Sequence, residues 1–286
     1  MDIQTLIFFK TVAKCGSFSA ASHELRYAQS NISTKIQQLE SDMQTTLFYR
    51  HNRGVTLTHK GELFLQYTDE ILNLLHKTKT AMKDDGVANG RLSIGSLETI
   101  AQVYLPSLLA TYHRDNPQVN LSISTGNSVE LTNSVLDRTL DGAFISGPVN
   151  HPDLKYIEFE TEKLLLATAA TNNTFSSCKD LENKTLLVFQ YGCYYRHLLE
   201  QLLQEKGIIP NQIVEFDSIG AIISSLCAGF GISLLPESIL SQYEKSNMLT
   251  TFNIPVRYSS VPTYFIYRKD YYTTTAFLHF IDCLNN

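Results

Sequence analysis

The stretch from Ser17 to Thr58 constrains the fold of this chain more than any other. Its apolar residues recur at spacings of three and four, first at Phe18, Ala21 and Leu25 and then at Ile32, Ile36 and Leu39. This is the period of a helix with one buried face, so the stretch predicts two short helices, with Arg26 and Tyr27 in the tight turn between them. The Ser17 hydroxyl can cap the first helix by accepting from its free backbone N–H groups.

The second of these helices carries a polar face that has almost no acidic side chain. The face consists of short or flexible hydrogen-bonding groups: Gln29, Ser30, Asn31, Ser33, Thr34 and Lys35. Gln and Asn can pair with adenine edges in the DNA major groove, where a helix-turn-helix inserts the N-terminal half of its second helix. The pattern favours DNA binding, although two amphipathic helices also pack in this way when their polar face meets only solvent.

A basic turn follows the helix pair in the segment FYRHNRGVTLT. Gly54 allows a turn between two short extended runs, which is the pattern of a wing. We expect Arg50 and Arg53 to contact phosphate or to enter the minor groove, and we assign Ser17 to the same group of DNA contacts.

The distribution of charge is that of a protein that touches DNA with one end. The formal net charge of the whole chain is −5, which by itself would discourage a nucleic-acid partner. Residues 1–60, however, hold seven Lys or Arg and four Asp or Glu, a net +3, whereas residues 91–286 hold 13 bases and 19 acids, a net −6. Because DNA affinity grows with the number of phosphates neutralised, a +3 head predicts that two or more copies bind together.

Residues 1–60 resemble the N-terminal domain of LysR-type transcriptional regulators. The matching pieces are MDIQTLIFFKTVAKCGSFSAAS, L-x-x-x-QS-x-IS-x-KI-x-x-LE, LF-x-R and RGVTLT-x-x-G, in this order, and the rest of the chain fits the family too. Two positions depart from the family pattern. Ala28 stands where Ser or Thr usually caps the recognition helix, and Thr34 stands where Arg is frequent, so we expect modest DNA affinity per subunit.

A long helix is predicted next, from a cap at Thr58 to about Met82. Its apolar residues form two faces, one of Leu63, Tyr67 and Leu74 and the other of Phe64, Ile71 and Leu75. So broad a stripe favours a partner helix, and the alternative is a connector that packs on its own domain. The resemblance implies a linker helix that pairs two subunits and places two recognition helices on a pseudo-palindromic site. Gly86 and Gly90 then mark a domain boundary.

From residue 91 onward, strand-like runs alternate with helical stretches. The strand-like runs are RLSIGS, NLSIST, DGAFIS, TLLVFQ, IVEFD, ISLLP and TYFIY, and the helical stretches span 100–113, 129–138, 195–206, 219–228 and 273–283. This alternation predicts α/β units with mostly parallel sheets, arranged as one domain or as two lobes.

The family resemblance favours two lobes. LysR-type effector domains look like type 2 periplasmic binding proteins, whose lobes are joined by two crossover strands, expected here near 160–163 and 262–265. The predicted fold class is an N-terminal all-α winged helix-turn-helix with a long linker helix, followed by a two-lobed α/β effector domain. The predicted domains are the DNA-binding domain 1–58, the linker helix and hinge 59–90, and the effector domain 91–286, with lobe I at 91–161 and 265–286 and lobe II at 162–264.

A small-molecule site is predicted where strands end and helices begin, because ligands bind at that edge of an α/β sheet. The candidate residues are Ser96, Glu98, Thr99, Thr125, Gly126, Ile145, Ser146 and Gly147 in lobe I, and Tyr194, Arg196 and Ser218 in lobe II. Ser96 and Thr99 are equally suited to cap helices. Arg196 could grip a ligand carboxylate or pair with Glu200 one turn later. Glu98 would repel an anion and favour an amine or a bound cation, unless it points away.

Other functions have less support in the sequence. Cys193 and His197 have the composition of a thiolate–base pair, but no orienting third group or oxyanion site accompanies them, so we expect no enzyme. Neither metal-ligand spacing nor a glycine-rich phosphate loop is present, and we expect no catalytic residue, metal or cofactor. The competing hypotheses are a metabolite-binding protein whose helix-turn-helix serves assembly only, and an enzyme on the same scaffold.

Cysteine usage and the N-terminal segment predict the compartment. The five cysteines are scattered without a pairing framework, and MDIQTLIFFK contains neither a basic leader nor a membrane span. We therefore expect a cytoplasmic regulator that binds double-stranded promoter DNA and a small metabolite, with no membrane partner. The resemblance further implies a dimer or tetramer that acts on RNA polymerase.

Overall fold

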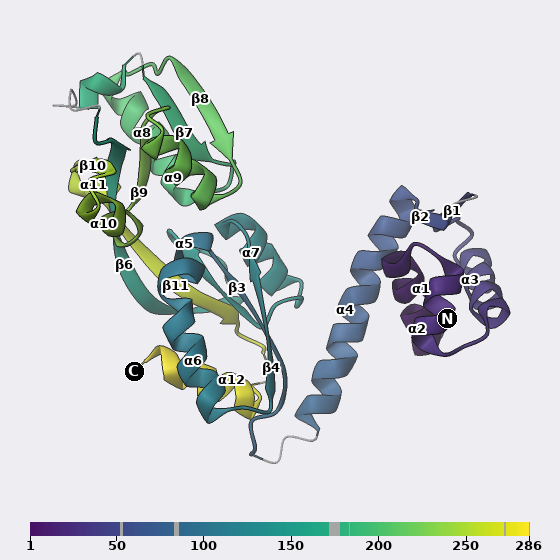
Figure 1. Ribbon diagram of the computed structural model, residues 1–286. Coiled ribbons are helices and arrows are strands. Elements are labelled where there is room, and N and C mark those ends of the chain that lie inside the picture. Colours follow the sequence, from purple (N-terminus) through teal and green to yellow (C-terminus); the bar gives the residue numbers. More distant parts are fainter. Residues whose placement is uncertain (52–53, 83–85, 172–177, 183, 272, 286) are drawn as a thin grey trace. The chain divides into compact units, whose positions relative to one another are not determined.

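Figure 1 shows the computed structural model, which describes residues 1–286 except 52–53, 83–85, 172–177, 183, 272 and 286. By its internal contacts the chain divides into two compact units, Met1–Lys83 and Asp84–Asn286. Each unit has hydrophobic core clusters of its own. Among the described residues, no helix has both the length and the apolar character that a membrane span needs.

The first unit is a helix-turn-helix with a wing and a long final helix. Its elements are α1 (Ile3–Cys15), α2 (Phe18–Leu25), α3 (Gln29–Asp42), β1 (Phe48–His51), β2 (Gly54–Leu57) and α4 (His59–Ala81). The core is largely aromatic: the Phe9 ring contacts those of Phe48 and Phe64, with centroids 5.1 Å and 4.9 Å apart. Because Phe64 belongs to α4, this packing fixes the start of the long helix on the domain.

Two of these helices begin at the capping residues that the sequence predicted. The Ser17 and Thr58 hydroxyls each accept from the backbone N–H three residues on, at 3.4 Å and 2.9 Å, and so begin α2 and α4. Ala28 gives α3 no side-chain cap, as its departure from the family pattern implied. Arg26 adopts a left-handed conformation, with φ of 58°, in the turn between α2 and α3.

The wing is joined to the end of α1. The Val55 N–H donates to the Gly16 carbonyl at 2.8 Å, and β1 pairs antiparallel with β2. A Cβ at Gly54 would lie 2.3 Å from the Gly16 carbonyl oxygen, so only glycine allows the two backbones to approach this closely.

The second unit begins with a parallel sheet. Its first elements are β3 (Gly90–Ser96), α5 (Glu98–Val103), α6 (Leu105–Asp115), β4 (Val119–Thr125), α7 (Ser128–Leu136) and β5 (Gly142–Ser146). β3 pairs parallel with both β4 and β5, so the ends of these strands lie at one edge of the sheet. The last helix of the chain, α12 (Thr275–Leu284), packs on α6. We call this part lobe I.

Lobe II follows a long strand, β6 (Leu154–Ala169). Its elements are η1 (Cys178–Leu181), β7 (Thr185–Phe189), α8 (Tyr194–Lys206), β8 (Gln212–Phe216), α9 (Ile219–Cys227), β9 (Ser233–Pro236), α10 (Glu237–Lys245), β10 (Leu249–Phe252) and α11 (Val256–Ser259). The strand β11 (Ser260–Arg268) then returns to lobe I. The first part of β6 pairs with β11, and its last residues pair with β9 and β10 (Figure 1).

The sheets are mixed, which corrects the prediction of mostly parallel sheets. β3–β4, β3–β5 and β7–β8 are parallel, whereas β6 pairs antiparallel with β9, β10 and β11, and β11 pairs antiparallel with β5. The reason is connectivity: one crossover strand leaves lobe I and the other returns to it, so the two run in opposite directions.

Candidate functional site

The face of α3 predicted to contact DNA is exposed over most of its length. Gln29, Ser30, Asn31 and Thr34 are exposed, and Ser33 is half-buried. On the opposite face, Ile32 and Ile36 are fully buried in the core. This division leaves the short polar side chains free to reach base edges while the buried face holds the helix on the domain.

Three of the other candidates make contacts within the domain. Lys35 lies 3.1 Å from the Asp2 carboxylate. Arg50 lies over the Phe18 ring, 5.0 Å from its centroid, and 3.6 Å from Glu40. Ser17 caps α2, as already described. Arg53 lies outside the described residues.

The first turn of α1 depends on the same carboxylate. Asp2 accepts from the backbone and the hydroxyl of Thr5, both at 2.7 Å. Hydrogen bonds from the Thr5 side chain and backbone, followed by the one from Lys35, lower the pKa of Asp2 to about 2. Asp2 is therefore ionised at neutral pH, and Lys35 has a competing partner when it is offered a phosphate.

One side of α4 presents apolar residues to solvent. Leu63, Tyr67, Ile71 and Leu74 are 43%, 56%, 42% and 51% exposed and recur at helical spacing, whereas Phe64 packs into the domain core. Ile71 therefore belongs to the exposed row and not, as the sequence suggested, to the face of Phe64; that face packs on its own domain, and the row forms an exposed apolar stripe.

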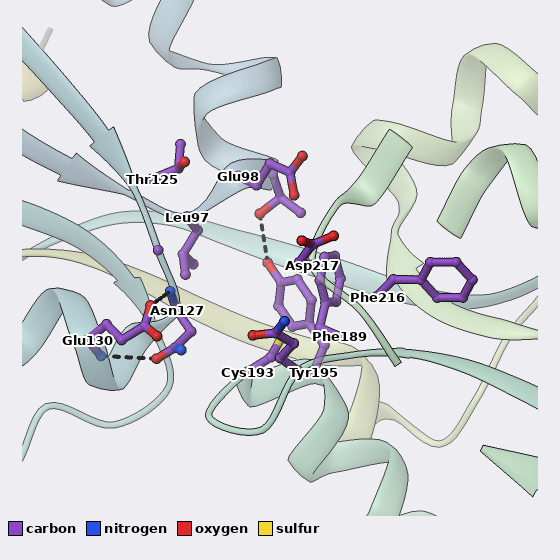
Figure 2. Close-up of a pocket in the computed structure, with 13 residues that line it drawn as sticks. Leu97, Glu98, Thr125, Asn127, Glu130, Phe189, Cys193, Tyr195, Phe216 and Asp217 are labelled. Atoms are coloured by element: carbon purple, nitrogen blue, oxygen red, sulfur yellow. Dashed lines mark hydrogen bonds between the residues drawn. The ribbon is translucent and has the colours of Figure 1, made fainter. Parts of the chain in front are cut away.

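A cavity of about 310 Å³ opens between the two lobes of the second unit. Lobe I contributes residues at the ends of β3 and β4, and lobe II contributes residues after β7 and β8 (Figure 2). The lining residues are Leu97, Glu98, Thr99, Thr125, Gly126, Asn127, Glu130, Phe189, Gln190, Cys193, Tyr195, Phe216 and Asp217. This is the edge at which an α/β sheet ordinarily binds its ligand.

The structure sorts the predicted effector residues into three groups. Glu98, Thr99, Thr125 and Gly126 line the interlobe cavity. A second cavity, of about 480 Å³, is lined in part by Ile145, Ser146, Tyr194 and Arg196. Neither of these cavities is lined by Ser96, Gly147 or Ser218.

Two residues of the third group have structural roles. Ser96 is fully buried and its hydroxyl donates to the Leu97 carbonyl at 2.9 Å, so it is neither a helix cap nor open to a ligand. Gly147 has a φ of 92°, and a Cβ there would lie 2.7 Å from the Tyr194 ring. Gly147 therefore permits a close approach between the end of β5 and the start of α8.

Ser218 takes part in a contact between the lobes. Glu98, at the start of α5, accepts from the Ile219 N–H at 2.9 Å and from the Ser218 hydroxyl at 3.4 Å. Ile219 is the first residue of α9, and Ser218 gives that helix no side-chain cap of its own. A carboxylate of lobe I therefore caps a helix of lobe II.

A buried hydrogen-bond chain also joins the lobes. The Tyr195 hydroxyl donates to the Glu162 carboxylate on β6 and is 3.2 Å from the Thr99 hydroxyl, which can donate to it. Burial raises the pKa of Glu162 and that of Tyr195. Figure 2 shows a hydrogen bond at the Tyr195 hydroxyl beside the cavity. The sequence analysis placed Glu162 only within a crossover strand. Its hydrogen bond with Tyr195 could not be predicted, because the two residues are distant in sequence.

Arg196 is already held by carboxylates. Its guanidinium lies 2.8 Å from Glu200 and 2.9 Å from Glu215, and it also donates to the Phe189 carbonyl at 3.2 Å. Of the two predicted roles, the structure has the pairing with Glu200, and the contact with a ligand carboxylate stays a prediction for a residue that lines the second cavity. Burial raises the pKa of the neighbouring Cys193 thiol, which opposes the formation of a nucleophilic thiolate.

Two family models match the chain. Residues 3–62 match the bacterial regulatory helix-turn-helix protein model of the lysR family, and residues 85–286 match the LysR substrate binding domain. The chain belongs to the LysR family of transcriptional regulators. It is therefore a DNA-binding regulator with a ligand-binding domain, as the sequence predicted, and LysR regulators bind promoter DNA and small-molecule effectors.

Relatives and solved structures agree along the whole length of this LysR regulator. It is 45% identical to the HTH-type transcriptional regulator GltR of Bacillus subtilis over 281 aligned residues. The alignment covers 98% of this chain and 95% of GltR. It is 41% identical over 281 residues to CzcR of Bacillus anthracis, covering 98% and 96%. The structure of full-length CbnR in complex with its target DNA matches with a TM-score of 0.75 and 23% sequence identity, and the match covers 100% of this chain and 99% of CbnR. The structure of full-length BenM matches with a TM-score of 0.58 and 21% sequence identity, and the match covers 100% of this chain and 96% of BenM. These two structures confirm the predicted fold class.

Several cavity residues of this LysR regulator were not among the predicted effector contacts. They are Glu130, Phe189, Gln190, Cys193, Tyr195, Phe216 and Asp217, whereas Leu97 and Asn127 lie within two of the strand ends at which a ligand was expected. A signal was present for some of them, because Gln190 and Asp217 end runs that were predicted as strands, Phe189 and Phe216 come directly before those ends, and Tyr195 opens a predicted helix. Asn127 and Glu130 form a capping box at the start of α7, a spacing that can be read from the sequence.

Proposed function

We propose that two subunits of this regulator read a pseudo-palindromic promoter site through the exposed polar face of α3. The observation that carries the proposal is the contrast across that helix, with hydrogen-bonding side chains exposed on one face and Ile32 and Ile36 fully buried on the other. The proposed groove contacts are Gln29, Ser30, Asn31, Ser33, Thr34 and Lys35. The proposed phosphate or minor-groove contacts are Ser17, Arg50 and Arg53.

The uncovered stripe on α4 supports self-association through that helix. An exposed row of large apolar side chains at helical spacing is the surface that a second amphipathic helix covers. We propose the same division of the chain as before: the DNA-binding domain 1–58, the linker helix and hinge 59–90, and the effector domain 91–286. Two dimers formed through α4 would then assemble into a tetramer. On promoter DNA, in the cytoplasm, this tetramer would contact RNA polymerase.

The interlobe cavity is the proposed effector site. Its walls come from both lobes, so a ligand bound there contacts both. Such a ligand shifts the equilibrium between an open and a closed arrangement of the lobes if it binds one arrangement more tightly than the other. We infer that the effector acts by shifting lobe closure. The half-buried Cys193 thiol, whose pKa is raised, and the exposed His197 support no catalytic pair, and we propose that the protein is not an enzyme.

A footprint of the purified protein on its own upstream DNA, at two salt concentrations, tests this function. Two protected patches separated by helical turns would support the regulator, and weak unphased protection that is lost with salt would leave a metabolite-binding protein. The Gln29→Ala variant sharpens the test, because loss of a base contact costs about 1–3 kcal/mol at the cognate site only. Gln37→Ala, an exposed position of α3 outside the proposed contacts, is the control. Equal losses by Gln29→Ala on cognate and random DNA would contradict base reading by Gln29.

A further inference from the structure

The interlobe cavity is strongly acidic. Among the described residues that line it, the charged side chains are Glu98 and Glu130 from lobe I and Asp217 from lobe II, and no Lys, Arg or His is present. Asp217 has no ion pair or side-chain hydrogen bond within the described part of the chain. Carboxylates of one sign that line a concave wall set up a potential that attracts cations and repels anions.

The chain's own acceptors already occupy two helix starts beside this cavity. Glu98 accepts from the first N–H of α9 at 2.9 Å. At α7, the Asn127 side chain accepts from the N–H groups of Val129 and Glu130, both at 3.0 Å, and Glu130 accepts from the Asn127 N–H at 3.2 Å. Helix N-termini ordinarily offer their free N–H groups to an anion. At these two helices an anionic ligand would have to displace a carboxylate or an amide of the protein.

Aromatic rings form another part of the wall. Phe189 and Tyr195 both line the cavity, and their ring centroids are 6.4 Å apart. Figure 2 shows these rings in the same part of the cavity as the Asp217 carboxylate. Aromatic groups next to carboxylates suit an organic ammonium group, which is attracted by both. A metal ion fits less well, because no group of three or more His, Cys, Asp or Glu side chains in the described chain is placed to hold one.

We propose that the effector of this regulator is a small organic cation, with a protonated amine held between Glu98 of lobe I and Asp217 of lobe II, while Glu130 adds to the negative potential of the wall. This inference rests on the proposed function, because it names the class of molecule that the effector site takes. The amine lies between carboxylates of lobe I and lobe II, so it relieves their mutual repulsion and stabilises the closed arrangement. Glu98 and Asp217 are then the residues that determine specificity.

Thermal unfolding of the full-length protein with putrescine and with succinate tests the charge preference. The two probes have the same four-carbon length and opposite charges, and are compared at equal concentration and ionic strength. Putrescine should raise the unfolding midpoint saturably, and succinate should not. Asp217→Asn should weaken the apparent putrescine affinity by about tenfold, the equivalent of one lost charge contact. Glu182→Gln, an exposed carboxylate outside the cavity, should leave that affinity unchanged.

A second variant should reverse the preference for a cation over an anion. Glu98→Ala leaves the first N–H groups of α9 without their acceptor, so succinate should raise the unfolding midpoint of this variant. Glu98→Gln is the control: its amide oxygen can still accept from Ile219, so it should not gain succinate binding. Stabilisation of the wild type by succinate rather than putrescine would overturn the inference. So would a lack of response to either probe, or a putrescine response that is equal in Asp217→Asn and in the wild type.

These outcomes are separate from the test of DNA binding. The unfolding measurements contain no DNA, so a preference for succinate would refute the cationic effector and leave the footprint intact. A missing footprint with putrescine binding intact would refute the regulator and leave the chemistry of the cavity standing.

Discussion

Glu162 is a buried carboxylate on the strand that connects the lobes. It is 3% exposed, and of its two oxygens one accepts from Tyr195 whereas the other has no partner among the described residues. Burial raises its pKa above 4.5 in the folded protein. Because the folded state then holds the proton more tightly than the unfolded chain, the free energy of unfolding falls as pH rises from about 4.5 through the folded pKa.

Glu162→Gln should remove this loss of stability. The glutamine oxygen can still accept from Tyr195, and the variant cannot ionise, so its stability relative to the wild type should increase across that pH window by about 1.4 kcal/mol for each unit of pKa elevation. Denaturant titrations of the full chain at a series of pH values measure this difference. Glu158→Gln, an exposed position on the same strand, is the matched control. A constant difference between Glu162→Gln and the wild type would show that Glu162 does not titrate as inferred.

Side-chain roles were predictable from the sequence where the partner is close along the chain. The caps at Ser17 and Thr58, the missing cap at Ala28 and the pairing of Arg196 with Glu200 all involve residues within four positions. The Glu98 contact with Ile219 spans 121 positions, and only the folded lobes bring these residues together. The sequence did raise the possibility that Glu98 favours a cation, because its charge is a local property.

The helix α4 carries a row of exposed apolar side chains at helical spacing. Its exposed row ends at Leu74, which is 51% exposed. Leu74→Glu should leave the isolated subunit folded, because the side chain is not part of its core. It should weaken self-association by at least about tenfold, since a lost Leu contact costs about 1.5–3 kcal/mol and a buried unpaired charge costs more. Sedimentation equilibrium measures this change. Gln66→Glu, which adds the same charge at another exposed site of α4, is the control, and equal dissociation of both variants would exclude a specific helix pair.

Elements with a clear apolar period were predicted well, and the exceptions have physical causes. The strand β6 was recognised only near its middle, because Lys155, Glu158 and Glu160 are exposed and break the pattern of a buried strand. The predicted helix 100–113 is two helices, α5 and α6, which meet at Tyr104 just before Pro106. Proline is favoured in the first turn of a helix and removes an N–H from a helix interior, so the chain restarts there.

For the whole molecule, charge decides how many subunits must bind DNA together. The chain has a formal net charge of −5 overall, with the excess of basic residues confined to its N-terminal part. A small basic surface on an acidic protein gives one subunit few phosphate contacts, so several subunits are needed for affinity at physiological salt. The number of engaged subunits can be counted from the salt dependence of binding, because each phosphate contact contributes about 0.9 to the slope of log K against log salt.

Arg53→Ala provides that count. If Arg53 makes one phosphate contact per subunit, the slope should fall by about 1.8 when two subunits are engaged and by about 3.6 when four are. The affinity for all DNA sequences should fall together, because a phosphate contact carries no sequence information. Binding titrations of wild type and Arg53→Ala on cognate and random DNA over a range of salt concentrations measure both effects. A decrease of about 0.9 would mean that a single subunit holds the DNA. Assembly through α4 would then serve the effector domains rather than the operator.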